Sequence, residues 1–274
     1  QENVIVKARK RTSTREQDKV IITMSKNKHF EKLTTIEVSS ADVVHHRNGE
    51  IFIRIPTSPF DVDVLHIVDK WPNTLRDWGL EISTGPVVPF RATQYLLPNL
   101  TQSPESVPLL WMHNMQGIRV TWPLVKNNKP SAIRLCKQTL PLLVPVKNYI
   151  LVKRFSSKEQ KRRLHATVLL QSDFPYESIG IENHVNYIYR PRGSLSVYEA
   201  FGIAALLDTT IVDNYFRSLN GNTQVNAIDI RSLPLPKIED IEKVGMAVYK
   251  SESCRKGFFD LEVVVNKILG IKTP

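Results

Sequence analysis

Only two cysteines occur among the 274 residues, Cys136 and Cys254, and they lie far apart. The sequence therefore lacks a zinc-type pair of closely spaced thiols, and reduced thiols in a cytoplasmic protein are expected. Long apolar runs are also missing. The longest, from Leu140 to Leu151, contains two prolines and a lysine, so nothing approaches the roughly 20 residues that cross a bilayer. We expect no membrane-spanning helix.

Motifs for chemistry are absent as well. There is no glycine-rich phosphate loop and no dinucleotide-binding fingerprint, and the histidines show no metal-ligand spacing. Asp208, Asp213 and Asp229 match no known ligand set and suit solvated or helix-capping roles. No Asn-Pro-Pro-Tyr or similar tetrapeptide, which would accept an extruded base, occurs. The sequence predicts no catalytic, cofactor-binding or metal-binding residue.

What the sequence does have is positive charge. Its formal net charge is +10 and its isoelectric point is near 9.6, in an otherwise ordinary globular composition with 42% apolar residues. This excess points to a polyanionic partner or an anionic surface. Charge alone does not distinguish DNA, RNA and membrane.

The first part of the chain is rich in short β-strand patterns. Residues 3–8 and 19–24 each contain a run of β-branched residues and predict a hairpin with a basic loop, and residues 50–55 predict a strand after an Asn-Gly turn. Residues 61–78 have helical periodicity, interrupted at Pro72. Because an isolated hairpin is marginal in water, the first two strands are expected to belong to a larger sheet.

Small polar residues then form the first candidate contact site. Ser83, Thr84 and Gly85 lie between two apolar pieces, which predicts a turn whose amides and hydroxyls could hold a phosphate, or a simple β-turn. Arg91 follows closely. Further strands are predicted at 107–111, 118–122 and 149–152.

A basic run follows the last of these strands. Six of the eleven residues from Lys153 to Arg163 are cationic. Cations and hydroxyls at a strand end suit successive phosphates, although such runs are also typical of a solvated face. The candidate clamp residues are Lys153, Arg154, Ser156, Ser157 and Lys158.

An amide-rich loop from Asn220 to Pro236 follows the longest helical pattern. That helix is predicted to start at Val197, because Ser196 and Glu199 form a capping box, with a second start near Thr209 and Thr210. Side-chain amides offer a donor beside an acceptor, as base edges require. The same residues also fit a capped helix end, a tight turn and a short helix that begins after Asn226. The candidate base-reading residues are Asn222, Thr223, Gln224 and Asn226.

Five blocks in this order resemble a known family. They are residues 1–6, 79–88, 153–159, 183–187 and 220–236, and together they are similar to the C-terminal half of bacterial type II adenine-N6 DNA methyltransferases, the PstI/BsuBI-like modification methylases. The resemblance implies an α+β fold: a mixed β-sheet target recognition domain with C-terminal helices, preceded by the terminal hairpin of a Rossmann-like catalytic domain. Residues 1–26 would be the last strands of that domain, and residues 27–274 the recognition domain.

The resemblance also implies a function. The intact bacterial, cytoplasmic enzyme of a restriction-modification system would transfer a methyl group from S-adenosylmethionine to adenine in double-stranded DNA. Its cofactor and catalytic motifs would precede Gln1, which is not a methionine, so the chain is expected to bind no cofactor and to be inactive without an upstream catalytic domain. The alternatives are a non-enzymatic specificity subunit of a type I system and a basic structural protein without sequence preference.

Overall fold

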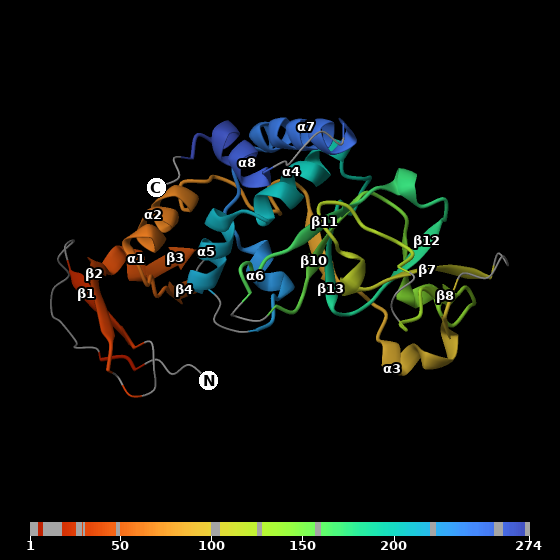
Figure 1. Ribbon diagram of the computed structural model, residues 1–274, viewed down its shortest axis with the longest axis horizontal. Coiled ribbons are helices and arrows are strands. Elements are labelled where there is room, and N and C mark those ends of the chain that lie inside the picture. The colour runs from red at the N-terminus through yellow and green to blue at the C-terminus, as the bar shows by residue number, and fades with distance from the viewer. Residues whose placement is uncertain are drawn as a thin grey trace. The chain divides into compact units, whose positions relative to one another are not determined.

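The protein is described by a computed structural model over residues 5–7, 18–25, 29, 31–47, 50–99, 105–124, 128–156, 160–219, 223–254 and 260–271. The chain divides into two units, Gln1–Asp63 and Val64–Pro274. Helix α2 (Pro59–Val68) contains the boundary between them. Figure 1 shows the elements of each unit.

The first unit is built from two hairpins. Strands β1 (Lys19–Ser25) and β2 (Leu33–Ser39) pair antiparallel, from Lys19 opposite Ser39 to Ser25 opposite Leu33. The short helix α1 (Ser40–Val43) then leads into the antiparallel pair of β3 (Val44–Arg47) and β4 (Glu50–Ile53). Strand β4 confirms the strand predicted after the Asn-Gly turn.

The first hairpin differs from the predicted one. Strand β1 contains the predicted residues 19–24, but its partner is β2, and residues 5–7 lie outside any strand. The predicted pairing of 3–8 with 19–24 is wrong for the residues described. A shorter connection closes at a lower entropy cost than the basic loop would. The hairpin also spans residue 26, and the domain boundary placed there stays a prediction.

The second unit contains two sheets. One has the order β11-β10-β13-β5 and is antiparallel throughout; the other has the order β6-β8-β7-β12-β9, in which β12 runs parallel to β7. The strands are β5 (Glu81–Thr84), β6 (Leu96–Leu97), β7 (Ser106–Leu110), β8 (Ala132–Arg134), β9 (Leu143–Pro145), β10 (Tyr149–Lys153), β11 (Ala166–Leu169), β12 (Ser178–Ile181) and β13 (Val185–Tyr189). The predicted α+β class with a mixed sheet is therefore confirmed.

The two sheets share a hydrophobic core. Leu151 of β10 and Leu169 of β11 belong to one buried cluster with Leu110 and Ile181 of the other sheet. On β7 the neighbouring Leu109 belongs to a separate cluster. Since successive side chains of a strand point to opposite faces, β7 is buried on both.

Helices follow the sheets in the sequence (Figure 1), and some of them contact strands of the first sheet. They are α4 (Val197–Leu207), α5 (Thr210–Leu219), α6 (Ala227–Arg231), α7 (Ile238–Cys254) and α8 (Leu261–Leu269), and a four-residue helix α3 (Pro89–Ala92) lies before them. Among the residues that the structure describes, no helix combines the length and apolar character of a membrane span.

Helix α4 is the centre of the helical layer. It is buried on almost every side, as expected for a helix that packs on β10 and β11 on one side and on α7 on the other. Two glycines allow the close approach of the helices: a β-carbon at Gly202 would overlap the carbonyl oxygen of Ile241, and one at Gly245 would overlap that of Tyr198. Larger residues at either position would force α4 and α7 apart.

The start of α4 confirms the predicted capping box. The Ser196 hydroxyl accepts from the Glu199 amide at 3.0 Å, and the Glu199 carboxylate accepts from the Ser196 amide at 2.6 Å. Arg190 donates to both carboxylate oxygens, at 2.8 and 3.0 Å. Burial raises the pKa of Glu199, but the bonds from Arg190 and Ser196 outweigh it and leave the pKa below its ordinary value.

This lowered pKa predicts a pH dependence. Stabilisation by ionised Glu199 is present above the unfolded-state pKa and is lost as the pH falls through the lower folded-state pKa. We expect the midpoint of thermal unfolding to fall more steeply between about pH 6 and about pH 3 for the wild type than for Glu199→Gln. The exposed Glu177→Gln serves as the control. Parallel curves for Glu199→Gln and the wild type would show that the carboxylate adds no pH-linked stability.

Three predicted elements are corrected. The helical pattern of residues 61–78 ends at Val68, well before Pro72, and its second half is a turn. Ser83 and Thr84 lie in β5 rather than in a turn, because long-range pairing with β13 extends this stretch. Residues 118–122 form only isolated bridges at positions 119 and 120. The predicted strands at 107–111 and 149–152 are confirmed by β7 and β10.

Candidate nucleic-acid interface

Two predicted sites, far apart in the sequence, lie side by side. Phe155 and Gln224 form an antiparallel bridge, the amide of Val225 donates to the carbonyl of Arg154 at 2.7 Å, and the amide of Ser156 donates to the carbonyl of Thr223 at 3.2 Å. We call residues 154–156 and 223–226 the paired loops. The basic run and the amide-rich loop are thus one structural feature at the end of β10.

A buried asparagine connects the paired loops to the sheet. Asn186 of β13 is 0% exposed and lies opposite Thr84 of β5. The Thr84 hydroxyl donates to its Oδ1 at 2.9 Å, and its Nδ2 donates to the carbonyl of Val225 at 2.8 Å. The chain beyond Thr84 passes close to the turn after β12, since a β-carbon at Gly85 would overlap the carbonyl of Glu182. Sheet and loop are therefore fixed to each other.

The remainder of the amide-rich loop is also fixed. Asn226 donates through its backbone amide and Nδ2 to the Asp229 carboxylate, at 3.2 and 3.1 Å. Arg231 at the end of α6 donates to the carbonyl of Ile82 at 3.1 Å, and Asn73 forms a bridge with Leu235. The short helix predicted after Asn226 is confirmed. The Asn226 amide is engaged within the loop, which leaves its base-reading role a prediction.

The cations in and beside the paired loops, Arg154 and Lys153, interact with groups inside the protein. Arg154 is half-buried, donates to the carbonyl of Asn183 at 3.0 Å, and its guanidinium lies 5.7 Å from the Phe155 ring centroid. Burial lowers the pKa of the Lys153 ammonium, and the negative charge of Asp208 opposes this effect. The phosphate-binding role expected for both residues stays a prediction.

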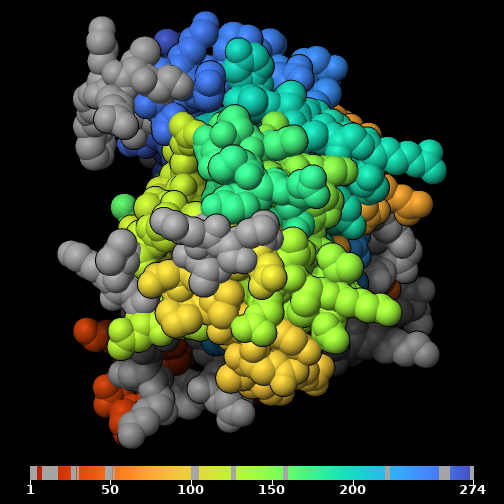
Figure 2. All heavy atoms as spheres, turned by 90° about the vertical axis from the view of Figure 1, so that its right-hand side faces the viewer, coloured from red at the N-terminus to blue at the C-terminus, as the bar shows by residue number. Residues whose placement is uncertain are grey.

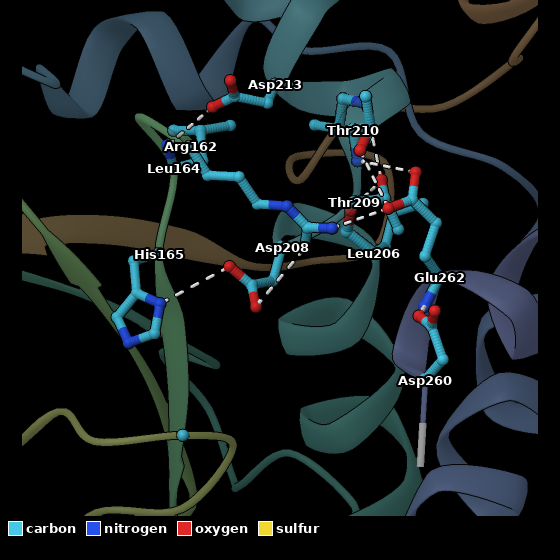
Figure 3. A network of polar contacts seen from close by, with 12 residues as sticks. Arg162, Leu164, His165, Leu206, Asp208, Thr209, Thr210, Asp213, Asp260 and Glu262 are labelled. Atoms are coloured by element: carbon cyan, nitrogen blue, oxygen red, sulfur yellow. Dashed lines mark hydrogen bonds and ion pairs between the residues drawn. The ribbon is translucent and has the colours of Figure 1, made fainter. Parts of the chain in front are cut away.

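The second half of the basic run is held by acidic residues (Figure 3). Arg162 forms ion pairs with Glu262 at 2.6 Å and with Asp208 at 3.7 Å. Glu262 also accepts from the Thr210 hydroxyl at 2.8 Å, so α5 and α8 are joined to this segment. Asp208 contacts His165 as well, at 3.4 Å. From the sequence, Arg162 is expected to belong to a cationic patch. In the structure it forms ion pairs with Glu262 and Asp208 within the protein.

Asp213 anchors the same segment. One of its carboxylate oxygens accepts from the backbone amides of Arg163 and Leu164, at 2.6 and 2.9 Å, and the other accepts from Arg217 at 2.6 Å. Arg163 is itself buried and donates to the Ser156 hydroxyl at 3.4 Å. The hydrogen bond from Arg163 to Ser156 thus connects the segment 160–164 to the paired loops.

Metal binding has no support in the part of the chain that the structure describes. No group of three or more His, Cys, Asp or Glu side chains that could hold a metal ion occurs there. Of the aspartates predicted in capping or solvated roles, Asp229 caps the start of α6 by accepting from the backbone amide of Asn226. Asp208 and Asp213 instead bind residues of the segment 160–165.

Other predicted contact residues differ in their surroundings. The Ser83 hydroxyl donates to Tyr189 Oη at 3.5 Å. Arg91 is exposed on α3, with its guanidinium 5.3 Å from the centroid of the exposed Phe90 ring. Helix α3 lies away from α6 in Figure 1, and the yellow segment around it forms the lower part of the face in Figure 2. The structure does not bring Arg91 to the paired loops. Ser157, Lys158 and Asn222 lie outside the described residues.

Several residues that organise this surface were given no individual role at the level of sequence. Asn186 is one, and Glu182 is another: its carboxylate is 1% exposed and contacts the backbone amide and Nδ1 of His184, whose ring lies 4.9 Å from that of Phe155. A polar residue inside an otherwise apolar strand such as β13 is a detectable signal. Its partners, however, are not local.

Comparison with known proteins identifies relatives. No protein-family model matches the sequence. The sequence is 34% identical over 215 residues to the type II methyltransferase M.PstI of Providencia stuartii, and 35% identical over 268 residues to the type II methyltransferase M.BsuBI of Bacillus subtilis. The chain is a relative of the PstI/BsuBI-like modification methylases. The resemblance inferred from the five sequence blocks is confirmed.

The coverage of these matches is uneven. They include 78% and 92% of this chain but 42% of M.PstI and 51% of M.BsuBI, so the chain spans about half the length of its relatives. Among solved structures, the chain is similar to one described under the structural basis of complex assembly and conformational transition of the type I R-M system. The match includes 76% of this chain and 49% of the other. Its TM-score of 0.38 and 10% identity carry no argument about function.

Proposed function

We propose that the chain is the sequence-specific DNA recognition portion of a site-specific adenine-N6 DNA methyltransferase. The intact enzyme would be a bacterial, cytoplasmic member of a restriction-modification system that uses S-adenosylmethionine. The observation that carries the proposal is the similarity of most of this chain to about half of M.PstI and M.BsuBI. The catalytic portion of the same protein would then be a partner of this chain, together with double-stranded DNA.

The chemistry of base methylation supports this division of labour. An enzyme that modifies a base inside a duplex has to extrude it, and a second surface then grips the DNA and checks the sequence. The net charge of +10 suits the phosphate backbone. The paired loops place Gln224, a residue type suited to adenine edges, on a segment that is fixed to the sheet.

Binding to DNA should therefore depend strongly on salt. A clamp that neutralises four phosphates gives a slope of about −3.6 in a plot of log affinity against log salt, or roughly 150-fold between 50 and 200 mM. Fluorescence anisotropy of the 274-residue chain with a labelled duplex measures this slope. We expect no methyl transfer from labelled S-adenosylmethionine in the same preparation.

Single charges can be assigned by the same titration. Arg154→Ala is expected to reduce the slope by about one, the value of one phosphate contact. Arg119→Ala removes an equal charge, but Arg119 is paired with Asp173 and Glu252 and should leave the slope unchanged. Affinity that stays flat with salt would contradict the phosphate clamp at residues 153–158.

The alternative of a non-enzymatic specificity subunit makes a different prediction about the gene. For a methyltransferase, the coding sequence that precedes Gln1 should contain a cofactor motif and an Asn-Pro-Pro-Tyr-type tetrapeptide. A coding sequence without them, combined with sequence-specific DNA binding by this chain, would favour the specificity subunit.

A further inference from the structure

The hydrogen-bond partners of Asn186 determine the orientation of its side-chain amide. Its amide lies between the Thr84 hydroxyl and the carbonyl of Val225. A carbonyl only accepts hydrogen bonds, so Nδ2 has to face Val225 and Oδ1 has to face Thr84, whose hydroxyl then donates. The pair Thr84 and Asn186 thus forms a directed chain of hydrogen bonds from β5 through β13 into the paired loops.

Val225 is held from both sides as a result. Its carbonyl accepts from Asn186 Nδ2 at 2.8 Å and its amide donates to the backbone carbonyl of Arg154 at 2.7 Å, while the residue is 0% exposed. In extended backbone, neighbouring side chains point to opposite sides. Fixing Val225 therefore fixes the direction in which the partly exposed Gln224 leaves the backbone.

We propose that Asn186 is a positioning residue that sets the DNA sequence preference of this chain by holding the backbone at Val225. The inference rests on the proposed function, since it assigns the control of that same recognition surface. Asn186 is fully buried and cannot touch DNA. Any effect of its substitution on sequence preference is therefore indirect, and the proposal assigns it to the paired loops, chiefly to Gln224.

The chain offers a matched control. Asn114 is also buried, with 1% exposure; its Oδ1 accepts from the amide of Trp111 at 2.8 Å and its Nδ2 donates to the carbonyl of Thr121 at 2.8 Å. Asn186→Asp and Asn114→Asp each keep the acceptor and turn the donor into a second acceptor that faces a carbonyl. The chemical defect is the same, but only one of them lies next to the paired loops.

The test starts with selection of preferred duplexes from a random library by the wild-type chain, followed by affinities for the selected and a scrambled duplex. Failure of the wild type to select any sequence would contradict the proposed function itself. If it selects one, Asn186→Asp should reduce the ratio of the two affinities about tenfold, comparable to the loss of one base contact. Asn114→Asp should shift the unfolding midpoint about as much as Asn186→Asp does, but should leave the ratio of the two affinities unchanged.

Two further readouts separate positioning from general damage. Amide hydrogen exchange of residues 223–226 should accelerate in Asn186→Asp and not in Asn114→Asp. In a double-mutant cycle, Asn186→Asp should add little loss of preference when Gln224→Ala is already present, because both act on one contact. If Asn186→Asp does not fold, the uncharged pair Asn186→Ser and Asn114→Ser is compared in the same way. An unchanged affinity ratio in a folded Asn186 variant would overturn the inference.

Discussion

Replacing Asp213 by alanine is expected to lower the free energy of unfolding of the second unit by about 3 to 5 kcal/mol. Asp213 is 2% exposed, and its carboxylate accepts the backbone amides of Arg163 and Leu164. Without it, two buried N–H groups lose their acceptor, at about 1 to 3 kcal/mol each. The pair with Arg217 adds less, because that side chain is 30% exposed and water screens it.

The measurement is urea unfolding followed by tryptophan fluorescence. All four tryptophans, Trp71, Trp78, Trp111 and Trp122, lie in the second unit and report on it alone. A lower midpoint with an unchanged slope gives the loss of stability directly. Asp213→Asn keeps an oxygen for the two amides but no charge for Arg217, so it should cost clearly less than alanine.

Asp240→Ala is the control for the loss of an aspartate. Asp240 pairs with the exposed Lys243 three residues along α7, at 2.8 Å, and such exposed pairs contribute little because water and salt screen them. Equal, small effects at Asp213 and Asp240 would contradict the anchoring role and show that water replaces the buried carboxylate.

Local signals in the sequence were sufficient for several elements. Helix α4 begins where Ser196 and Glu199 predict it, because both halves of a capping box lie within four residues. Helix α6 follows Asn226 for the same reason, and β10 agrees with an apolar run that ends at a cation. In each case the residues that decide the structure are neighbours in the chain.

The wrong predictions concern residues whose structure depends on partners far away in the sequence. Ser83 and Thr84 have the composition of a turn, yet the pairing of β5 with β13, about a hundred residues later, makes them a strand. The basic run is interpreted from the sequence as a cationic surface. In the structure, however, Arg162 donates to Glu262, a hundred residues away, and the amides of residues 163 and 164 donate to Asp213, about fifty residues away. The sequence does not show which distant residues come together in the fold. For the same reason it does not predict the contact between residues 154–156 and residues 223–226.

The joining of these loops makes Gln224→Ala the variant with the largest expected effect on sequence preference. A bidentate contact between glutamine and adenine contributes roughly 1 to 3 kcal/mol of discrimination, which corresponds to about a 5- to 150-fold lower ratio of selected to scrambled affinity. Affinity for the scrambled duplex should change little, since phosphate contacts dominate it. Anisotropy titrations of the two duplexes at one salt concentration measure both quantities.

Gln171→Ala controls for the loss of an exposed glutamine side chain. It should leave both affinities unchanged. Equal losses on the selected and scrambled duplexes for Gln224→Ala would show that residues 223–226 form only a structural turn.

Gln224→Glu sharpens the assignment, because it keeps the size and one acceptor of the side chain but removes the donor. A glutamine that reads adenine donates to N7 and accepts from N6, so the loss of its donor should weaken binding at one A·T pair only. Repeating the library selection with this variant should therefore relax one position of the selected sequence and preserve the others. Relaxation of several positions at once would instead indicate that the glutamate displaces the whole of residues 223–226, through repulsion from the phosphates.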